Sequence, residues 1–119
     1  GFDTDWLFGT SGTYSTRYFA GSGYVESDSH DSSTAQYITS GVNTGSVNSY
    51  YVNGADNTGS AVHVGTWGSQ LFIGSYDNTD FGAGDISEIV IYPYALSETD
   101  RKKVECYLGR RTSTAVTGC

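Results

Sequence analysis

The feature that most constrains the fold is an apolar run near the end of the chain. Residues 86–92 read Ile-Ser-Glu-Ile-Val-Ile-Tyr, and all but two of them are apolar. A run of this length, rich in β-branched residues, is typical of a strand that is covered on both faces. The sequence therefore predicts a central, buried strand here, with the carboxylate of Glu88 held by backbone or tyrosine donors.

A short amphipathic helix is predicted directly after this strand. Ser97 fits an N-cap, and acidic residues follow it in the first turn. The predicted apolar face of the helix comprises Val104, Tyr107 and Leu108. Gly109 is the residue at which we expect the helix to end.

The remainder of the chain has the composition of an all-β domain. Its 119 residues include 16 Gly and 10 Tyr but one Pro and no Met. Turn signals recur about every ten residues, which is the spacing of a sandwich or barrel. A chain of this length forms one domain with a modest core, so we predict a single all-β antiparallel domain over residues 1–119 with one short C-terminal α-helix.

The clearest hairpin signal is Asn53-Gly54, which follows an apolar stretch at residues 46–52. Asn-Gly supplies the two positive-φ positions that a type I′ turn requires, and we place the return arm at residues 61–64. Further strands are predicted at residues 5–8, 16–19, 23–26, 35–39 and 70–74.

The charge distribution argues against a nucleic-acid partner. The formal net charge is −7, yet the basic residues, apart from Arg17, all lie after residue 100. The body of the domain is therefore strongly acidic and repels phosphates. No apolar run approaches the ~20 residues of a membrane span, so membrane insertion is not predicted.

The two cysteines, Cys106 and Cys119, allow three arrangements. We favour an internal disulfide that ties the tail to the helix. Free thiols, or a bridge from Cys119 to a neighbouring subunit, are the alternatives. A disulfide, together with the Gly- and Tyr-rich composition, predicts an extracellular, cell-surface or virion location.

Three segments carry a family resemblance. They are residues 51–54 (Tyr-Val-Asn-Gly), residues 71–75 (Leu-Phe-Ile-Gly-Ser) and residues 81–108, which include the apolar run and the helix. Together they resemble the C-terminal half of laminin-G-like, concanavalin-A-like jelly-roll domains of the lectin and glucanase class, in their bacterial and phage-borne forms. The resemblance implies an antiparallel jelly-roll β-sandwich.

Members of that family usually carry more residues upstream. The resemblance therefore implies compressed first strands, a missing N-terminal part, or a partner chain that completes the sheet by strand addition.

Some enzymes with this fold are glycosidases, which need two carboxylates facing one cleft. The nearest candidates, Asp85 and Glu88, are three residues apart and so lie on opposite faces of a strand. No nucleophile elbow or recognisable triad is present. We therefore predict that the protein is not an enzyme.

Two kinds of binding site are predicted. Calcium, which laminin-G-like domains often hold, would be bound by Asp77 and Asp80, although Asp/Asn clusters are also common turn formers. A ligand site is predicted around Trp67, which stands between glycines on an expected loop and offers a flat face for a sugar ring or a protein. The accompanying residues are His63, Tyr76 and Asn78.

Two functions follow from these observations. The first is a non-catalytic extracellular recognition or adhesion module that binds a neutral glycan or a surface protein. The second is a structural subunit of an extracellular assembly, such as a virion decoration protein, a fibre or a filament component, with self-assembly or a parent chain supplying the partner. Fold-level analogy favours the first function.

Overall fold

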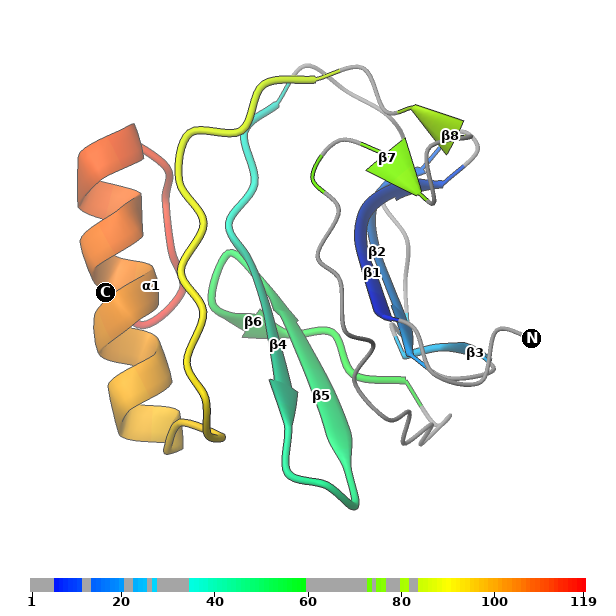
Figure 1. Cartoon of the computed structure of the whole chain (residues 1–119). Coiled ribbons are helices and arrows are strands. Elements are labelled where there is room, and N and C mark those ends of the chain that lie inside the picture. Colours follow the sequence, from blue (N-terminus) through cyan, green and yellow to red (C-terminus); the bar gives the residue numbers. More distant parts are fainter. Residues whose placement is uncertain are drawn as a thin grey trace.

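A computed structural model describes the backbone of residues 6–11, 14–20, 23–25, 27, 35–59, 73, 75–76, 80–81 and 84–119. Side chains are described at residues 25, 27, 35–59, 73 and 84–119. Within these ranges the protein consists of short antiparallel strands and one C-terminal α-helix (Figure 1). The predicted combination of antiparallel sheets with a terminal helix is therefore confirmed.

The first sheet is formed by the N-terminal strands β1 (Trp6–Ser11), β2 (Tyr14–Ala20) and β3 (Gly23–Tyr24), in that order. Phe19 of β2 is paired on both sides, with Leu7 of β1 and with Tyr24 of β3. Strands β2 and β3 therefore pair antiparallel and correspond to the strands predicted at residues 16–19 and 23–26.

The second sheet contains β4 (Thr39–Asn43), β5 (Asn48–Val52) and β6 (Ala55–Asp56), with β5 in the middle. The turn between β5 and β6 is the predicted Asn-Gly turn. Asn53 has φ 48° and Gly54 has φ 80°, as a type I′ turn requires. Asn53 Oδ1 also accepts a hydrogen bond from the Ile38 amide at 2.9 Å, which holds the chain just before β4 against the turn.

Strand β5 lies between two layers. Its residues alternate between buried and half-buried, as expected for a strand whose successive side chains point to opposite faces. Tyr50 and Val52 pack with Val25, at the end of β3, in the core cluster. On the opposite face, the Arg101 guanidinium of the helix lies over the Tyr51 ring, 3.4 Å from its centroid.

A short bridge joins the two sheets. Ser27 donates its amide to the Asn57 carbonyl at 2.7 Å, and Gly59 donates to the Val25 carbonyl at 2.6 Å. Asn57 in turn donates its amide to the Tyr50 carbonyl at 2.8 Å. Residues 57–59 therefore hold the segment after β3 next to β5. A separate two-stranded ladder pairs β7 (Ser75–Tyr76) with β8 (Asp80–Phe81).

The helix α1 (Glu98–Thr112) begins at the predicted N-cap. Ser97 Oγ accepts the Asp100 amide at 3.1 Å and donates to the Asp100 carboxylate at 2.9 Å. Hydrogen bonds from Lys103 and Ser97, together with the Lys103 charge, hold the pKa of Asp100 below its ordinary value. Acids in the first turn and the basic residues in the last turn complement the helix dipole.

After α1 the chain folds back over the helix and the second sheet. Ser113 adopts the left-handed conformation that ends the helix, and the Thr117 amide donates to the Asn53 carbonyl at 2.7 Å. The predicted Cys106–Cys119 disulfide is present, with a Cα–Cα distance of 5.6 Å. The tail therefore connects the helix to the β5–β6 turn.

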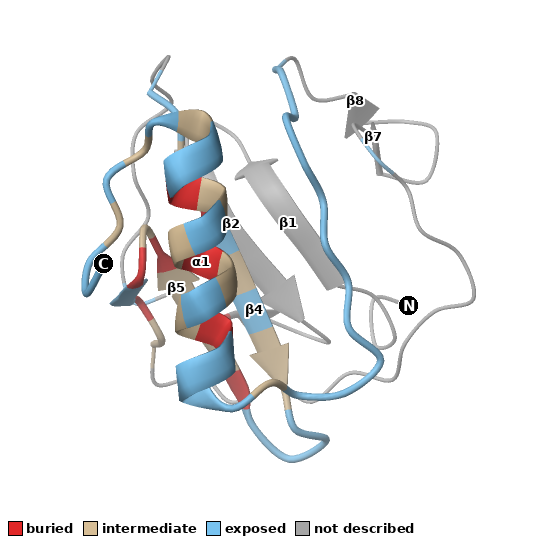
Figure 2. Ribbon diagram, turned by 90° about the vertical axis from the view of Figure 1, so that its left-hand side faces the viewer, coloured by how far each residue is buried: buried red, intermediate tan, exposed pale blue. Residues whose placement is uncertain are grey.

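The predicted central strand at residues 86–92 is wrong. These residues form no strand and run alongside α1 with their side chains exposed (Figure 2). Ile89 and Ile91, which were expected to be buried, are 49% and 56% exposed. The central position is taken by β5, whose faces are covered by Val25 on one side and Arg101 on the other.

Several predicted boundaries also differ. Residues 35–38 are not in a strand, and β4 begins at Thr39. The arm that returns beside β5 is β6, directly after the turn; residues 61–64 lie outside the described residues, as does most of the predicted strand at residues 70–74. The helix continues past Gly109, which is buried because Val116 of the tail lies against it.

Replacing Gly54 by alanine should destabilise the protein more than the same change at Gly45. Both glycines have positive φ, so each substitution carries a backbone cost on the order of 1 kcal/mol. A Cβ on Gly54 would also lie 2.7 Å from the Thr117 carbonyl and from Val116 Cγ1, whereas one on Gly45 meets nothing within 4 Å. We expect an additional loss of about 1–3 kcal/mol for Gly54→Ala, measured by denaturant unfolding. Equal losses would show that the tail does not pack on the turn.

Removing the disulfide should lower the free energy of unfolding by about 3 kcal/mol, because the bond closes a loop with a sequence separation of 13 residues. The double variant Cys106→Ser/Cys119→Ser and the reduced wild-type protein should lose similar amounts in denaturant titrations. A variant as stable as the oxidised protein would contradict a stabilising role for the link.

Candidate interaction surface

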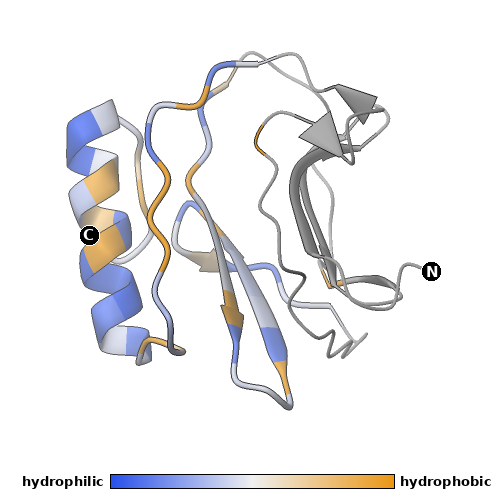
Figure 3. Ribbon diagram, in the orientation of Figure 1, coloured by the Kyte–Doolittle hydropathy of each residue, from blue (hydrophilic) through white to orange (hydrophobic). Residues whose placement is uncertain are grey.

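Among the side chains that the structure describes, the most unusual surface is formed by residues 85–95, called here the extended segment. It runs antiparallel to α1 along the length of the helix and passes between α1 and β4 in Figure 1. Figure 3 shows that it is largely hydrophobic, in contrast to the mostly hydrophilic first turns of the helix. Solvent-exposed segments are normally polar, so an exposed apolar segment is the leading candidate for a functional surface.

Six large apolar side chains of the extended segment are exposed to solvent. They are Ile86 (58%), Ile89 (49%), Val90 (43%), Ile91 (56%), Tyr92 (39%) and Tyr94 (65%). Single exposed apolar residues are normal on protein surfaces, but a contiguous group marks an interaction site. The extended segment therefore has the apolar content of a buried strand and the exposure of a surface loop.

The backbone of the extended segment is also unpaired. Within the described part of the chain, no hydrogen bond reaches a main-chain donor or acceptor of residues 85–95. Each residue other than Pro93 offers one N–H and one C=O group. An extended stretch with free backbone groups and apolar side chains is a template for pairing with another strand.

Two polar side-chain contacts join the extended segment to other described residues. Gln36 Nε2, just before β4, donates to Ser87 Oγ at 3.2 Å. Glu88 forms an ion pair with Arg111 of α1, with 3.2 Å between Oε2 and Nε. Glu88 is thus held by an arginine rather than by the predicted backbone or tyrosine donors. The Glu88 side chain therefore faces α1.

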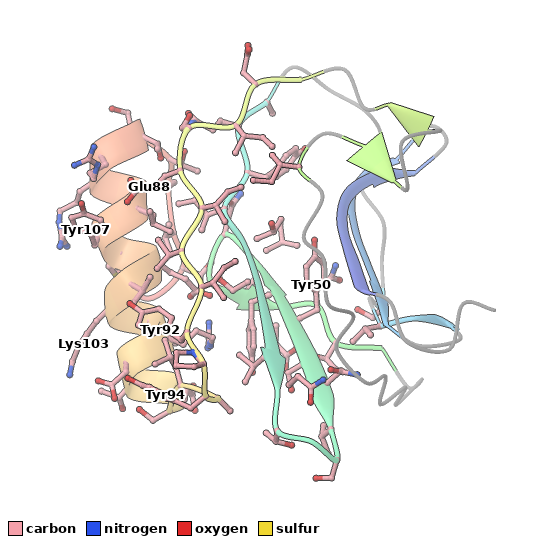
Figure 4. All side chains as sticks on the ribbon, in the orientation of Figure 1. Tyr50, Glu88, Tyr92, Tyr94, Lys103 and Tyr107 are labelled. Atoms are coloured by element: carbon pink, nitrogen blue, oxygen red, sulfur yellow. A yellow bond between two sulfur atoms is a disulfide. The ribbon has the colours of Figure 1, made fainter. Side chains whose placement is uncertain are left out.

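A pair of tyrosines lies at the end of the extended segment. The rings of Tyr92 and Tyr94 are 6.1 Å apart between centroids and are inclined at 57°. Figure 4 shows both side chains beside the N-terminal half of α1, while Lys103 and Tyr107 project from the outer side of the helix. Exposed tyrosine pairs offer flat apolar faces with polar edges, which suit both sugars and proteins.

Sequence reasoning missed how α1 contacts the sheet. The buried helix positions are Arg101, Glu105 and Gly109, which lie one turn apart on a single face. Arg101 Nη1 donates to both Glu105 oxygens, at 2.7 and 2.6 Å, and the side chains are 5% and 1% exposed. The predicted apolar face is covered only in part, since Val104 and Leu108 are half-buried and Tyr107 is 43% exposed. In the sequence, the only indication of this contact is that Arg101 and Glu105 are four residues apart. Arg–Glu pairs at this spacing are usually solvent-exposed, so the spacing does not predict burial.

The buried ion pair is a structural group. Arg101 lies between Glu105 and the Tyr51 ring, and its Nε atom is buried without a hydrogen-bond partner. Both charged groups are shielded from solvent, so neither can meet a ligand without moving the helix. Their role is to join α1 to β5.

The predicted ligand and metal residues lie mainly outside the described part of the chain. This applies to Trp67, His63, Asn78 and Asp77. Tyr76 and Asp80 are directly paired across the β7–β8 ladder, but their side chains are not among those described. The sugar site and the calcium site therefore stay predictions. In the described residues, no group of three or more His, Cys, Asp or Glu side chains could hold a metal ion.

No known family, curated protein or solved structure matches this chain. Among the described residues, no helix has the length and apolar character needed to cross a bilayer. The Cys106–Cys119 disulfide fits a non-cytoplasmic location.

Breaking the buried ion pair should destabilise the protein strongly. Arg101→Ala or Glu105→Ala leaves the opposite charge buried and unpaired, which costs about 3–5 kcal/mol. The double variant Arg101→Met/Glu105→Leu removes both charges while keeping most of the packing, so it should recover much of that loss. Denaturant unfolding measures all three variants.

The exposed helix pair provides the matched control. Lys103 and Asp100 are joined at 2.9 Å, but their side chains are 72% and 55% exposed, so Lys103→Ala should change stability little. If Arg101→Ala were as mild as Lys103→Ala, the Arg101–Glu105 pair would not be what holds α1 on the sheet.

Proposed function

We propose that this protein is a non-catalytic extracellular interaction module, of laminin-G-like sandwich type, that associates with protein through its extended segment. The observation that carries the proposal is the combination of exposed apolar side chains and unpaired backbone at residues 85–95. Strand addition uses both: main-chain hydrogen bonds supply affinity, and alternate side chains supply specificity.

The side chains of the extended segment favour a protein partner over a sugar. Three isoleucines and one valine lie between residues 86 and 91. Branched aliphatic side chains offer no flat face for stacking on a sugar ring, but they pack well against β-branched and aromatic residues of a neighbouring strand. A protein surface is therefore the better chemical match.

The sandwich assignment is supported by the placement of the two three-stranded sheets. Strand β2 lies against β5, and residues 57–59 connect the sheets through backbone hydrogen bonds. The Asn-Gly turn and the capped terminal helix are the other family-like features that have counterparts in the structure. In a complete jelly roll the extended segment would occupy a strand position, and none of the described strands pairs with it.

Neutral-glycan binding is the second candidate function. It is favoured by the exposed Tyr92–Tyr94 pair and by the predicted site around Trp67. A sugar would need one of these aromatic faces, so Tyr94→Ala and Trp67→Ala are the variants that separate this function from association through the isoleucines.

The test is a binding array that carries extracellular proteins, neutral glycans and the protein itself. We expect retention on protein spots, with at least a tenfold loss for Ile89→Lys, because a charge would be placed in an apolar contact. Val47→Lys is the matched control, since Val47 is 43% exposed and belongs to the turn between β4 and β5 rather than to the extended segment. It should bind like the wild type.

The glycan spots decide between the two functions. Retention on glycans alone, lost in Tyr94→Ala or Trp67→Ala and kept in Ile89→Lys, would replace the proposed function by glycan recognition. Absence of binding on every spot would contradict both functions. Calcium is added to one half of the array, and binding that requires it would support the predicted Asp77 and Asp80 site.

A further inference from the structure

We infer that the partner of the extended segment is a second copy of this chain, paired antiparallel with it about a two-fold axis at Ile89. This inference rests on the proposed function and names its partner. Its basis is that the segment complements itself in one register, in charge and in apolar area, as a closed two-fold interface requires.

The register follows from the sequence of the extended segment. An axis at Ile89 places Ile86 opposite Tyr92, Ser87 opposite Ile91 and Glu88 opposite Val90. The outermost pair is thus a β-branched residue against an aromatic one, a favourable cross-strand combination. Seven residues pair in this register, and Pro93, which has no N–H to donate, falls just outside it.

Neighbouring registers are worse. An axis at Glu88 would place two carboxylates directly opposite each other, which is destabilising. An axis at Val90 or beyond would draw Pro93 into the ladder and remove a hydrogen bond. The Ile89 register avoids both problems, so the sequence itself selects it.

Charge does not oppose the pairing. The carboxylate of Glu88 is already ion-paired with Arg111 of its own α1, so the ladder introduces no unpaired charge at its centre. Asp85 lies at the end of the paired stretch, opposite Pro93, where water still reaches it. Although the net charge of the protein is −7, the Arg111 charge of α1 lies beside Glu88 and offsets part of the repulsion locally.

The apolar side chains add to the contact that backbone pairing provides. The six exposed side chains are on average about half exposed. Strand pairing covers only the part of each side chain that faces the partner strand, so the apolar contact of two copies stays below the roughly 1,200 Å² at the lower end of specific interfaces. We therefore expect a weak dimer, with main-chain hydrogen bonds supplying much of its affinity.

The first experiment measures self-association of the full chain by sedimentation equilibrium over a concentration series. We expect a monomer–dimer equilibrium whose dissociation constant rises at least tenfold in Ile89→Lys, since two lysines would meet at the axis, and stays unchanged in Val47→Lys. Circular dichroism and unfolding of both variants show that they are folded.

The second experiment tests the register. Directly opposed residues on antiparallel strands have Cα atoms ~4.5–5.5 Å apart, within the reach of a disulfide. Ile89→Cys should therefore form a covalent dimer on mild oxidation, while Ile91→Cys should not, because residue 91 lies opposite residue 87 of the other copy. Equal cross-linking of the two variants would overturn the Ile89 register.

The results separate failure of this inference from failure of the proposed function. A monomer at every concentration that still binds foreign proteins on the array, with loss in Ile89→Lys, overturns the second copy as partner and keeps the proposed function. A monomer that binds no protein spot overturns both. A dimer that is unaffected by Ile89→Lys places the interface elsewhere and overturns the inference.

Discussion

The two-sided burial of β5 is the constraint on which the rest of the described structure depends. One face of this strand packs Tyr50 and Val52 on Val25, and the other carries Tyr51 beneath the Arg101 guanidinium. A short strand can fill both roles because its side chains alternate. The first sheet and the helix are therefore joined through the same five residues, and a defect in β5 would affect both layers.

The helix is attached to β5 by a charged pair, and this has a cost. Burying ions requires nearly complete compensation, and here it comes from two hydrogen bonds to Glu105 and from the aromatic ring below Arg101. An apolar helix face would have adhered to any apolar surface, including the extended segment beside it. The arginine accepts one partner geometry, so it fixes the position of α1 while the isoleucines of the extended segment stay available.

The sequence predicted features that depend on local chemistry. The Asn53-Gly54 turn is predictable because few residues other than Asn and Gly adopt positive φ. The start of the helix is predictable because the Ser97 side chain accepts a hydrogen bond from the Asp100 amide. The disulfide is predictable because two cysteines allow few arrangements. The course of residues 86–92 could not be predicted in the same way. Their apolar pattern shows that they are suited to burial. Burial also requires a covering layer, and no residue of the run encodes where that layer lies.

The candidate site was missed for the same reason. Aromatic and acidic residues on expected loops drew attention to Trp67, Asp77 and Asp80, whose side chains the structure does not describe. The exposed surface that the structure does describe consists of residues that the pattern assigned to the core. Exposure of Ile86 or Ile91 is a property of the assembled fold, and apolar periodicity carries no information about it.

The ion pair between Glu88 and Arg111 has a consequence for solution conditions. The Arg111 side chain is 60% exposed, so dissolved ions weaken its attraction for Glu88. The contact between Gln36 and Ser87 is between neutral groups and does not respond in this way. Raising the ionic strength therefore weakens the contact of the extended segment with α1 and leaves its contact with the residues before β4 in place.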